Sequence, residues 1–456
     1  MPSEIIITPE KTFQTIEGFG ASGAWTAQEV GAWPEKEREA VAKLLFDKTE
    51  GLGLNIWRYN IGSGSKQSGK GNFPNPRRAT VAFTAPNEPL GTFDFSRDAE
   101  AMWFVRRAAA YGADEIVFFV NSPLERFTIT GTAQGKIPFH KNLKRSCEKA
   151  FVRYLLDVTE HFVSEGLPIR FLSPVNEPFG PWIAKTGQEG CHYSPAGVRR
   201  LFRLCAQEMD KRPGLDNVKL SGAENNDLRL MNKSYTRAVL CDRTIRARMD
   251  GIDVHGYVFG PLAKLKGVRE RFRKYLDKRF PNEKVRMSEW THMVGGRGYG
   301  MDSALEQART MCADLSILNA VSWQCWIAVS EVQFHDGLIY IDLPERKVSL
   351  PKRYAAFGNF SRFVRRGAVR IGCQYSDADL NAVAFVEDSQ TVLVIVNTSQ
   401  TDKPIRLSGA DGNGKMFITD ERHNLAVMEI TSQDFTLPAL SVCTLQLIQP
   451  TTPPLS

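Results

Sequence analysis

The tripeptide Asn-Glu-Pro occurs twice in this 456-residue chain, within TAPNEPLG at residues 84–91 and within SPVNEPFG at residues 173–180. An Asn-Glu pair at the end of a strand is a common way to place a proton-donating carboxylic acid against a sugar. A further glutamate, Glu289, stands in VRMSEWTHM. Two opposed carboxyl groups are what glycoside hydrolysis requires, because one protonates the leaving oxygen and the other attacks the anomeric carbon or activates water.

The part of the chain that must position these groups alternates short apolar runs with amphipathic helical patterns, from about residue 17 to residue 360. Strands are expected at 16–22, 54–60, 115–121, 170–176, 218–224, 251–257, 284–290 and 321–327. Helical periodicity is clear at 35–47, 97–112, 146–166 and 303–320. Eight βα units predict an α/β fold, a (β/α)8 TIM barrel. A doubly wound open sheet is the alternative, but no glycine-rich phosphate loop leads from a strand into a helix.

After residue 365 the pattern changes to short β-type runs separated by turn residues. These runs are 380–387, 391–397, 403–408, 414–420 and 440–448, which is typical of an antiparallel β-sandwich. The opening EIIITPEKTFQTI is also β-patterned, and we expect it to join the same small sheet. The expected organisation is N-terminal strands in 1–16, a catalytic barrel in 17–365 and a side β-sandwich in 366–456.

The position of each glutamate relative to the strands separates the two Asn-Glu-Pro copies, because barrel sites form at the C-terminal ends of strands. Glu177 follows the fourth expected strand, and Glu289 ends the seventh, which faces the fourth across a barrel mouth. No helix separates Glu88 from the second strand, so we expect Glu88 to be a solvated turn residue in an insertion. A strand-end glutamate can also be a plain ion-pair partner, but two of them set among Trp, Tyr and Asn favour catalysis.

Several residues near the other strand ends suit a sugar site. Arg58 could keep a nucleophilic carboxylate ionised through charge-assisted hydrogen bonds, and Asn176 suits a hydrogen bond to a sugar hydroxyl. Indole faces stack on pyranose rings, although any single tryptophan could equally belong to the core. Trp57 and Trp323 are expected in the core, and His192 and His292 are given no role. The further candidates for substrate binding are Trp25, Asn121, Trp182, His255, Tyr257 and Trp326.

Composition and charge exclude several other classes of function. The net charge of +7 is spread through the chain, and the basic runs at 268–280 and 362–370 alternate basic with apolar residues as helix faces do, so no nucleic-acid partner is expected. The eight cysteines form no CxxC pair, and neither a metal nor a cofactor is expected. No signal peptide or membrane-spanning run is visible. We expect a monomer without membrane association, cytoplasmic as the sequence stands and secreted if a signal has been removed.

The motifs IEGFGASGAW, LNIWRYNIGSGS, SPVNEP, MSEW, SWQCW and LPALSVCTLQL together resemble glycoside hydrolase family 30, in a clan of retaining (β/α)8 glycosidases. The resemblance implies that Glu177 is the acid/base and Glu289 the nucleophile. It also implies that Arg58, Asn176, Tyr257 and Trp326 line the subsite of the cleaved sugar. The segment GQEGCHYSP at 187–195 resembles the branch that acts on β-1,6-galactans.

The activity expected on these grounds is retaining hydrolysis of a β-linked polysaccharide or oligosaccharide, specifically by an endo-β-1,6-galactanase acting on arabinogalactan side chains. Other activities of the same family stay open as alternatives: β-1,6-glucanase, β-glucosidase or glucosylceramidase-like hydrolysis, and xylanase. A non-catalytic carbohydrate-binding barrel is the alternative from another class, and the presence of both glutamates argues against it.

Overall fold

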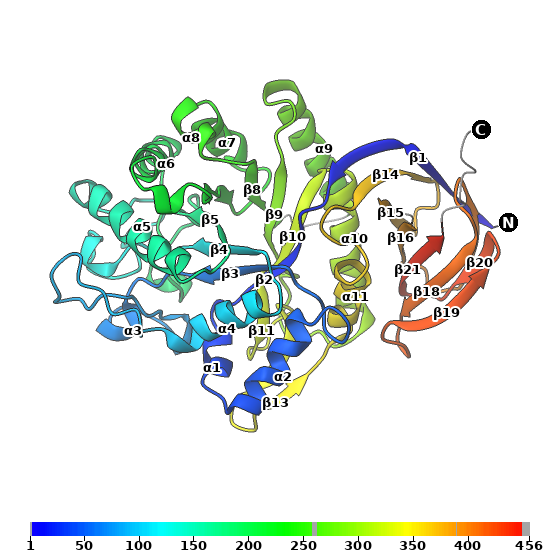
Figure 1. Ribbon diagram of the computed structural model, residues 1–456, viewed down its shortest axis with the longest axis horizontal. Helices are drawn as coiled ribbons and strands as arrows, with labels where there is room; N and C mark the ends of the chain where they lie inside the picture. Colours follow the sequence, from blue (N-terminus) through cyan, green and yellow to red (C-terminus); the bar gives the residue numbers. More distant parts are fainter. Residues whose placement is uncertain (1, 258–261, 389, 449–456) are drawn as a thin grey trace.

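A computed structural model describes residues 2–257, 262–388 and 390–448. Its larger part is a barrel of parallel strands with helices around it (Figure 1). The barrel strands are β2 (Gly18–Ser22), β3 (Ile56–Asn60), β4 (Glu115–Phe119), β5 (Ile169–Ser173), β6 (Lys219–Leu220), β7 (Ala223–Asn225), β8 (Ile252–His255), β9 (Val285–Trp290) and β10 (Ala320–Cys325). Each of the eight expected strands is present, which confirms the predicted barrel.

The fifth expected strand is interrupted, so it is divided into β6 and β7. β6 pairs with β5, and β7 pairs with β8. Ser221 and Gly222 lie between them, so β6 and β7 fill one position of the barrel. The opposite seam is closed by parallel pairing of β10 with β2. Every residue of β3, β9 and β10 is buried, as expected for parallel strands that are covered on both faces.

Helices follow the strands and cover the outside of the barrel (Figure 1). The longer helices are α2 (Glu35–Phe46), α4 (Ala99–Ala110), α5 (Glu148–Ser164), α6 (Pro195–Met209), α7 (Asn232–Leu240), α9 (Leu262–Arg279), α10 (Met301–Ser316) and α11 (Lys352–Ser361). The shorter ones are α1 (Ala27–Gly31), α3 (Ser65–Ser68) and α8 (Arg243–Ala247). Trp57 and Trp323 are buried in the core, as predicted. A small sheet of β11 (Ile327–Ser330), β12 (Gly337–Asp342) and β13 (Lys347–Ser349) follows β10.

The C-terminal strands form a second, nine-stranded sheet with its own apolar core, beside the barrel in Figure 1. Its strands are β1 (Ser3–Thr15), β14 (Val369–Tyr375), β15 (Leu380–Glu387), β16 (Gln390–Asn397), β17 (Lys403–Ser408), β18 (Asn413–Thr419), β19 (Ala426–Thr431), β20 (Asp434–Leu437) and β21 (Ser441–Ile448). β1 lies between β14 and β17, so the N-terminal strand joins this sheet as expected. The division at residues 16 and 365 stays a prediction.

The basic run at 362–370 differs from its sequence-based interpretation. Its first residues form a turn after α11, and Val369 and Arg370 already belong to β14. Gly367 has a φ of +97°, which ends the helical pattern because side-chain-bearing residues rarely adopt that conformation. The other basic run, 268–280, lies in α9 up to Arg279, as its helical pattern indicates.

α11 joins the two parts of the molecule through a buried asparagine. Asn359 donates from Nδ2 to the carbonyl of Phe417 in β18 and to the Oγ1 of Thr444 in β21, both at 3.0 Å. Its Oδ1 accepts from Thr419 at 2.7 Å. Satisfied polar groups of this kind hold buried surfaces in one register. The barrel and the side sheet are therefore joined by specific contacts.

Candidate active site

A cavity of about 530 Å³ opens at the C-terminal ends of the barrel strands. Glu177 and Glu289 both line it, although 111 residues separate them in the sequence. Aromatic and amide side chains make up much of the remaining wall. The lining residues are Trp25, Arg78, Asn121, Asn176, Glu177, Trp182, Gln188, Asn226, Asp227, Tyr257, Glu289, Thr291, Met293, Trp326, Val332, Gln333, Phe334 and Asp336.

Glu177 lies just beyond β5, in a backbone conformation that few glutamates adopt. Its φ is +43°, in the left-handed region, which costs about 1–3 kcal/mol for a residue with a side chain. Two hydrogen bonds hold it there: its amide donates to the carbonyl of Glu224 at 3.0 Å, and Trp182 Nε1 donates to its carbonyl at 2.8 Å. Non-glycine strain of this kind clusters at functional sites.

Glu289 is the penultimate residue of β9 and receives hydrogen bonds from Arg58 and Tyr257. Arg58 Nη1 donates to Oε2 at 2.9 Å, and Tyr257 Oη donates to Oε1 at 2.9 Å. Arg58 is fully buried on β3. Because both donors stabilise the charged form of the carboxyl group, they favour ionised Glu289. The expectation that Arg58 contacts this carboxylate is confirmed.

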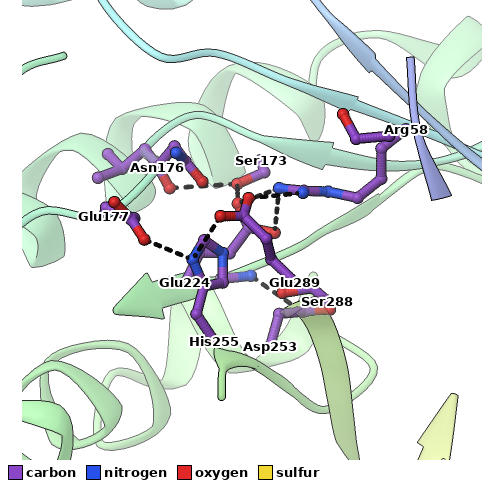
Figure 2. Close-up of polar contacts among 12 residues, drawn as sticks. Arg58, Ser173, Asn176, Glu177, Glu224, Asp253, His255, Ser288 and Glu289 are labelled. Atoms are coloured by element: carbon purple, nitrogen blue, oxygen red, sulfur yellow. Dashed lines mark hydrogen bonds and ion pairs between the residues drawn. The ribbon is translucent and has the colours of Figure 1, made fainter. Parts of the chain in front are cut away.

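His255, at the end of β8, lies between the two carboxyl groups. Its Nδ1 is 2.9 Å from Glu177 Oε1 and 3.4 Å from Glu289 Oε1, and Figure 2 shows the His255 side chain close to both glutamates. Burial lowers the pKa of His255, against the opposing effect of Glu289. Neutral imidazole then presents an Nδ1–H to these oxygens, while Nε2 is buried without a partner among the described residues. His255 and Arg58 were expected to bind substrate, but both are fully buried behind the carboxylates and neither lines the cavity.

Glu224 on β7 is a part of this network that the sequence reasoning missed. Both of its oxygens accept from Arg58 Nη2, at 3.2 and 3.3 Å, and Ser173 Oγ donates to Oε2 at 2.8 Å. Figure 2 shows the Arg58 guanidinium group beside the carboxyl groups of Glu224 and Glu289. The signal was available, since Glu224 ends the fifth expected strand just as Glu289 ends the seventh. Glycoside hydrolysis requires only two carboxyl groups, so Glu224 was assigned no role.

The two lining carboxyl groups are close together. One oxygen of Glu177 and one of Glu289 lie within 4.8 Å of each other. Burial, helped by the negative charge of Glu224, raises the pKa of Glu177 to about 8 in spite of Arg58. Burial also raises the pKa of Glu289, and His255 and Arg58 oppose that rise. The site therefore holds two carboxyl groups with different hydrogen-bond partners, which is how such pairs divide acid and base roles.

The walls of the cavity contain the other expected sugar-binding residues. Trp25 packs edge-on against Trp326, with ring centroids 5.0 Å apart. Asn176 Nδ2 donates to Asn121 Oδ1 at 3.0 Å, which leaves the Asn176 Oδ1 without a partner among the described residues. That oxygen is a free acceptor for a hydroxyl group. Trp182 is mostly buried and contributes only part of its indole to the lining.

The other Asn-Glu-Pro copy lies away from this cavity. Glu88 is in a turn between β3 and α4, as predicted. It is partly exposed, as expected of a turn residue at the surface, and it forms a 3.1 Å ion pair with Arg97 that the sequence did not indicate. The backbone amide of Ala85 and Arg97 lower the pKa of Glu88. Arg97 follows Glu88 by nine positions, and no periodic pattern signals such a contact inside a loop.

Among the described residues, Glu177, His255 and Glu289 could also hold a cation, because one ligand atom from each lies within 4.8 Å of the others. Two carboxylates and an imidazole form a reasonable donor set for a divalent ion. An ion bound there would coordinate both carboxylates that line the cavity, and neither would then be available to react with a sugar. We therefore treat the three residues as part of the reacting site. In the same described ranges, no helix is both long and apolar enough to cross a membrane.

Comparisons with known proteins agree with this fold. Residues 2–244 match O-Glycosyl hydrolase family 30, and residues 367–445 match the Glycosyl hydrolase family 30 beta sandwich domain. The chain is 26% identical over 420 residues to an endo-β-1,6-galactanase of Hypocrea rufa, covering 86% of this chain and 80% of the relative. It is 23% identical over 436 residues to lysosomal acid glucosylceramidase of Mus musculus, covering 89% and 79%.

A solved structure, that of a conserved exported protein from Bacteroides fragilis, superposes with a TM-score of 0.88 at 25% identity, covering 97% of this chain and all of that one. The barrel, its cavity and the paired carboxyl groups, together with these relatives, define a glycoside hydrolase. The chain belongs to glycoside hydrolase family 30.

Proposed function

We propose that this chain is a retaining endo-β-1,6-galactanase, with Glu177 as acid/base and Glu289 as nucleophile. The retaining mechanism is supported by the distance between these two groups, because one oxygen of Glu177 lies within 4.8 Å of one oxygen of Glu289. Retaining enzymes hold their carboxyl groups about 5–5.5 Å apart, whereas inverting enzymes leave about 6.5–9.5 Å for a water molecule. The similarity to an endo-β-1,6-galactanase over most of both chains supports the substrate.

The first step is attack of Glu289 on the anomeric carbon while Glu177 protonates the glycosidic oxygen. Glu177 keeps its proton at neutral pH because its pKa is about 8. Glu289 is the ionised partner, since Arg58 and Tyr257 donate hydrogen bonds to it. The bond from carbon to the leaving oxygen breaks as the ester forms, and the proton of Glu177 leaves with the alcohol product.

The second step is hydrolysis of the ester by water. Esterification removes the negative charge of Glu289, which lies close to Glu177, so the pKa of Glu177 should fall. The ionised Glu177 then removes a proton from water as the water attacks the same carbon. The two displacements restore the original anomeric configuration. His255 contacts both carboxyl groups and holds them in place through both steps.

Product analysis on defined polysaccharides tests this proposal. We expect β-1,6-galactan to be cut into a ladder of oligosaccharides, with little release from β-1,6-glucan or glucuronoxylan, and with a β-anomer as the first product in NMR spectra. Glu289→Gln serves as the matched inactive control. An initial α-anomer would refute retention. Cleavage of β-1,6-glucan, a glucosylceramide or xylan in preference to galactan would assign another activity of the family.

A further inference from the structure

Three aromatic rings form a cluster at the mouth of the barrel, outside the cavity. Phe139 lies in the loop between β4 and α5, whereas Phe179 and His192 lie in the loop between β5 and α6. The ring centroid of Phe139 is 5.4 Å from that of Phe179 and 6.1 Å from that of His192. None of these three residues is part of the cavity wall. We call Phe139, Phe179 and His192 the rim cluster.

The fold gains little from the side chain of Phe139. This side chain is 50% exposed, and the φ of Phe139 is +57°, in the left-handed region. A residue with a side chain adopts that conformation at a cost in free energy, and such residues are concentrated at functional sites. Ile137, in the same loop, is 53% exposed. Apolar side chains that are exposed together indicate a surface that binds something.

Backbone contacts on both sides of Phe139 fix its loop against the loop that follows β5. The amide of Gly135 donates to the carbonyl of Trp182 at 2.8 Å, and Lys141 forms an isolated β-bridge with His192. Phe139 is therefore exposed but held in position. A ligand that packs on it would not have to order the loop first, and this preorganisation lowers the entropic cost of binding.

The rim cluster lies on the side of the site where the leaving group belongs. In the proposed mechanism Glu177 protonates the leaving oxygen, so the sugars beyond the cleaved bond extend on the side of Glu177. Phe179 follows Glu177 by two positions. Trp182 lines the cavity and donates from Nε1 to the carbonyl of Glu177 at 2.8 Å. The same loop therefore connects the cavity wall with the rim cluster.

We propose that the rim cluster binds the leaving-group part of the glycan, so that the enzyme favours bonds with two or more sugars on that side. This rests on the proposed function, because it uses Glu177 as the acid. The C–H groups of a sugar ring pack on the electron-rich face of an aromatic ring. Burial lowers the pKa of His192, so its ring is uncharged at neutral pH and can pack in the same way as the phenyl rings.

An anionic membrane is the competing partner for this surface. Lys136 and Lys141 stand on either side of the exposed residues 137–140, and basic residues around apolar ones favour anionic lipid surfaces. The glycan is the better partner, because the loop that carries Phe179 and His192 also contributes Trp182 to the cavity wall. A chain that extends from the cavity past Glu177 would reach the rim cluster directly.

The pattern of bond cleavage in a labelled oligosaccharide tests the proposal. The substrate is a β-1,6-linked galactohexaose that carries ¹⁸O at its reducing end, and mass spectrometry reports how many sugars each leaving group contains. The parent should cut mainly at bonds with two or more sugars on the leaving side. This ratio compares bonds within one reaction, so it does not depend on the fraction of folded enzyme.

The variant Phe139→Asn removes the ring and keeps a residue that tolerates the left-handed conformation. It should raise the ratio of single-sugar to longer leaving groups by roughly 3- to 10-fold, as expected when the burial of half a phenylalanine side chain is lost. Phe139→Tyr keeps the ring and should keep the cleavage pattern of the parent. An unchanged pattern in Phe139→Asn would overturn the proposal.

Ile137→Asn is the matched control, because it removes a side chain of similar exposure from the same loop but leaves the three rings intact. It should keep the pattern of the parent, and a shift as large as that of Phe139→Asn would overturn the proposal. Sedimentation with phosphatidylglycerol vesicles is measured in parallel. Binding to these vesicles that both asparagine variants lose, with no change in cleavage pattern, would assign the surface to a membrane instead.

The linkage is tested separately from the rim cluster. If the parent cuts β-1,6-linked gluco-oligosaccharides or xylo-oligosaccharides but not the galactohexaose, the galactanase assignment fails. The same ratio, measured on the series that is cut, then still decides whether the rim cluster binds the leaving group. If the parent cuts none of these oligosaccharides, both proposals fail.

Discussion

Replacing Glu177 by glutamine should stabilise the protein at alkaline pH while abolishing efficient catalysis. In the folded protein the pKa of Glu177 is about 8, against an ordinary value of 4.5. The unfolded chain therefore loses this proton near pH 4.5, whereas the folded chain keeps it until about pH 8. Below pH 4.5 the carboxyl group is neutral in both the folded and the unfolded state, and this group costs no stability. As the pH rises from 4.5 towards 8, only the unfolded chain loses the proton, so the free energy of unfolding falls.

The size of this effect follows from the two pKa values. One pKa unit corresponds to about 1.4 kcal/mol, so moving from 4.5 to about 8 corresponds to at most about 5 kcal/mol. Glutamine is neutral at every pH and keeps an oxygen that can accept from His255 Nδ1, which is 2.9 Å from the carboxylate in the parent. The variant therefore does not lose stability at alkaline pH through ionisation at this position, and it keeps the contact with His255.

The assay is thermal unfolding of the parent and of Glu177→Gln at pH 5 and at pH 8.5. We expect nearly equal melting temperatures at pH 5 and a clearly higher melting temperature for the variant at pH 8.5. Glu115 and Glu189, whose pKa values are raised by burial to about 7, are present in both proteins and cancel in the comparison. A gain of the same size at both pH values, or a loss at pH 8.5, would refute the reasoning.

Three further substitutions test the assignments. Glu289→Gln should lower kcat on an aryl β-glycoside by roughly 10⁴-fold or more, and kcat close to the parent value would rule out its nucleophilic role. Glu88→Ala should leave kcat/KM nearly unchanged, because Glu88 does not line the cavity and its ion pair is with Arg97; a large loss would bring Glu88 back as a candidate. Glu224→Gln should move the alkaline limb of the kcat/KM profile to lower pH, because the charge of Glu224 raises the pKa of Glu177, and an unmoved limb would contradict that coupling.

Much of the barrel and the positions of the lining carboxyl groups could be predicted, because both depend on periodic signals. Buried parallel strands read as continuous apolar runs, and the geometry of a barrel brings strand ends to one face. The cavity includes Glu177 and Glu289 as that rule requires. The same rule would also have selected Glu224 if it had been applied to every strand.

Contacts made across loops could not be predicted in this way. His255 stands at a strand end, but the sequence does not show that its ring lies between two carboxyl groups rather than against the substrate. Arg78 lies in a polar segment without periodicity, so nothing in its neighbourhood predicts that it faces the cavity while Arg77 pairs with Glu331. The loops of a barrel are positioned by tertiary contacts, and those contacts are distant in sequence.

The placement of β1 in the C-terminal sheet has a consequence for synthesis. β1 pairs with β14 and β17, so that Ser3 lies opposite Ile405. During translation, which proceeds from the N-terminus, β1 is synthesised long before β14 and β17, so it has no partner strand until those segments follow. Its alternating apolar residues are meanwhile an unpaired edge of the kind that promotes aggregation. We therefore expect the yield of folded protein to depend on how well residues 3–15 are protected until β14 and β17 have been synthesised.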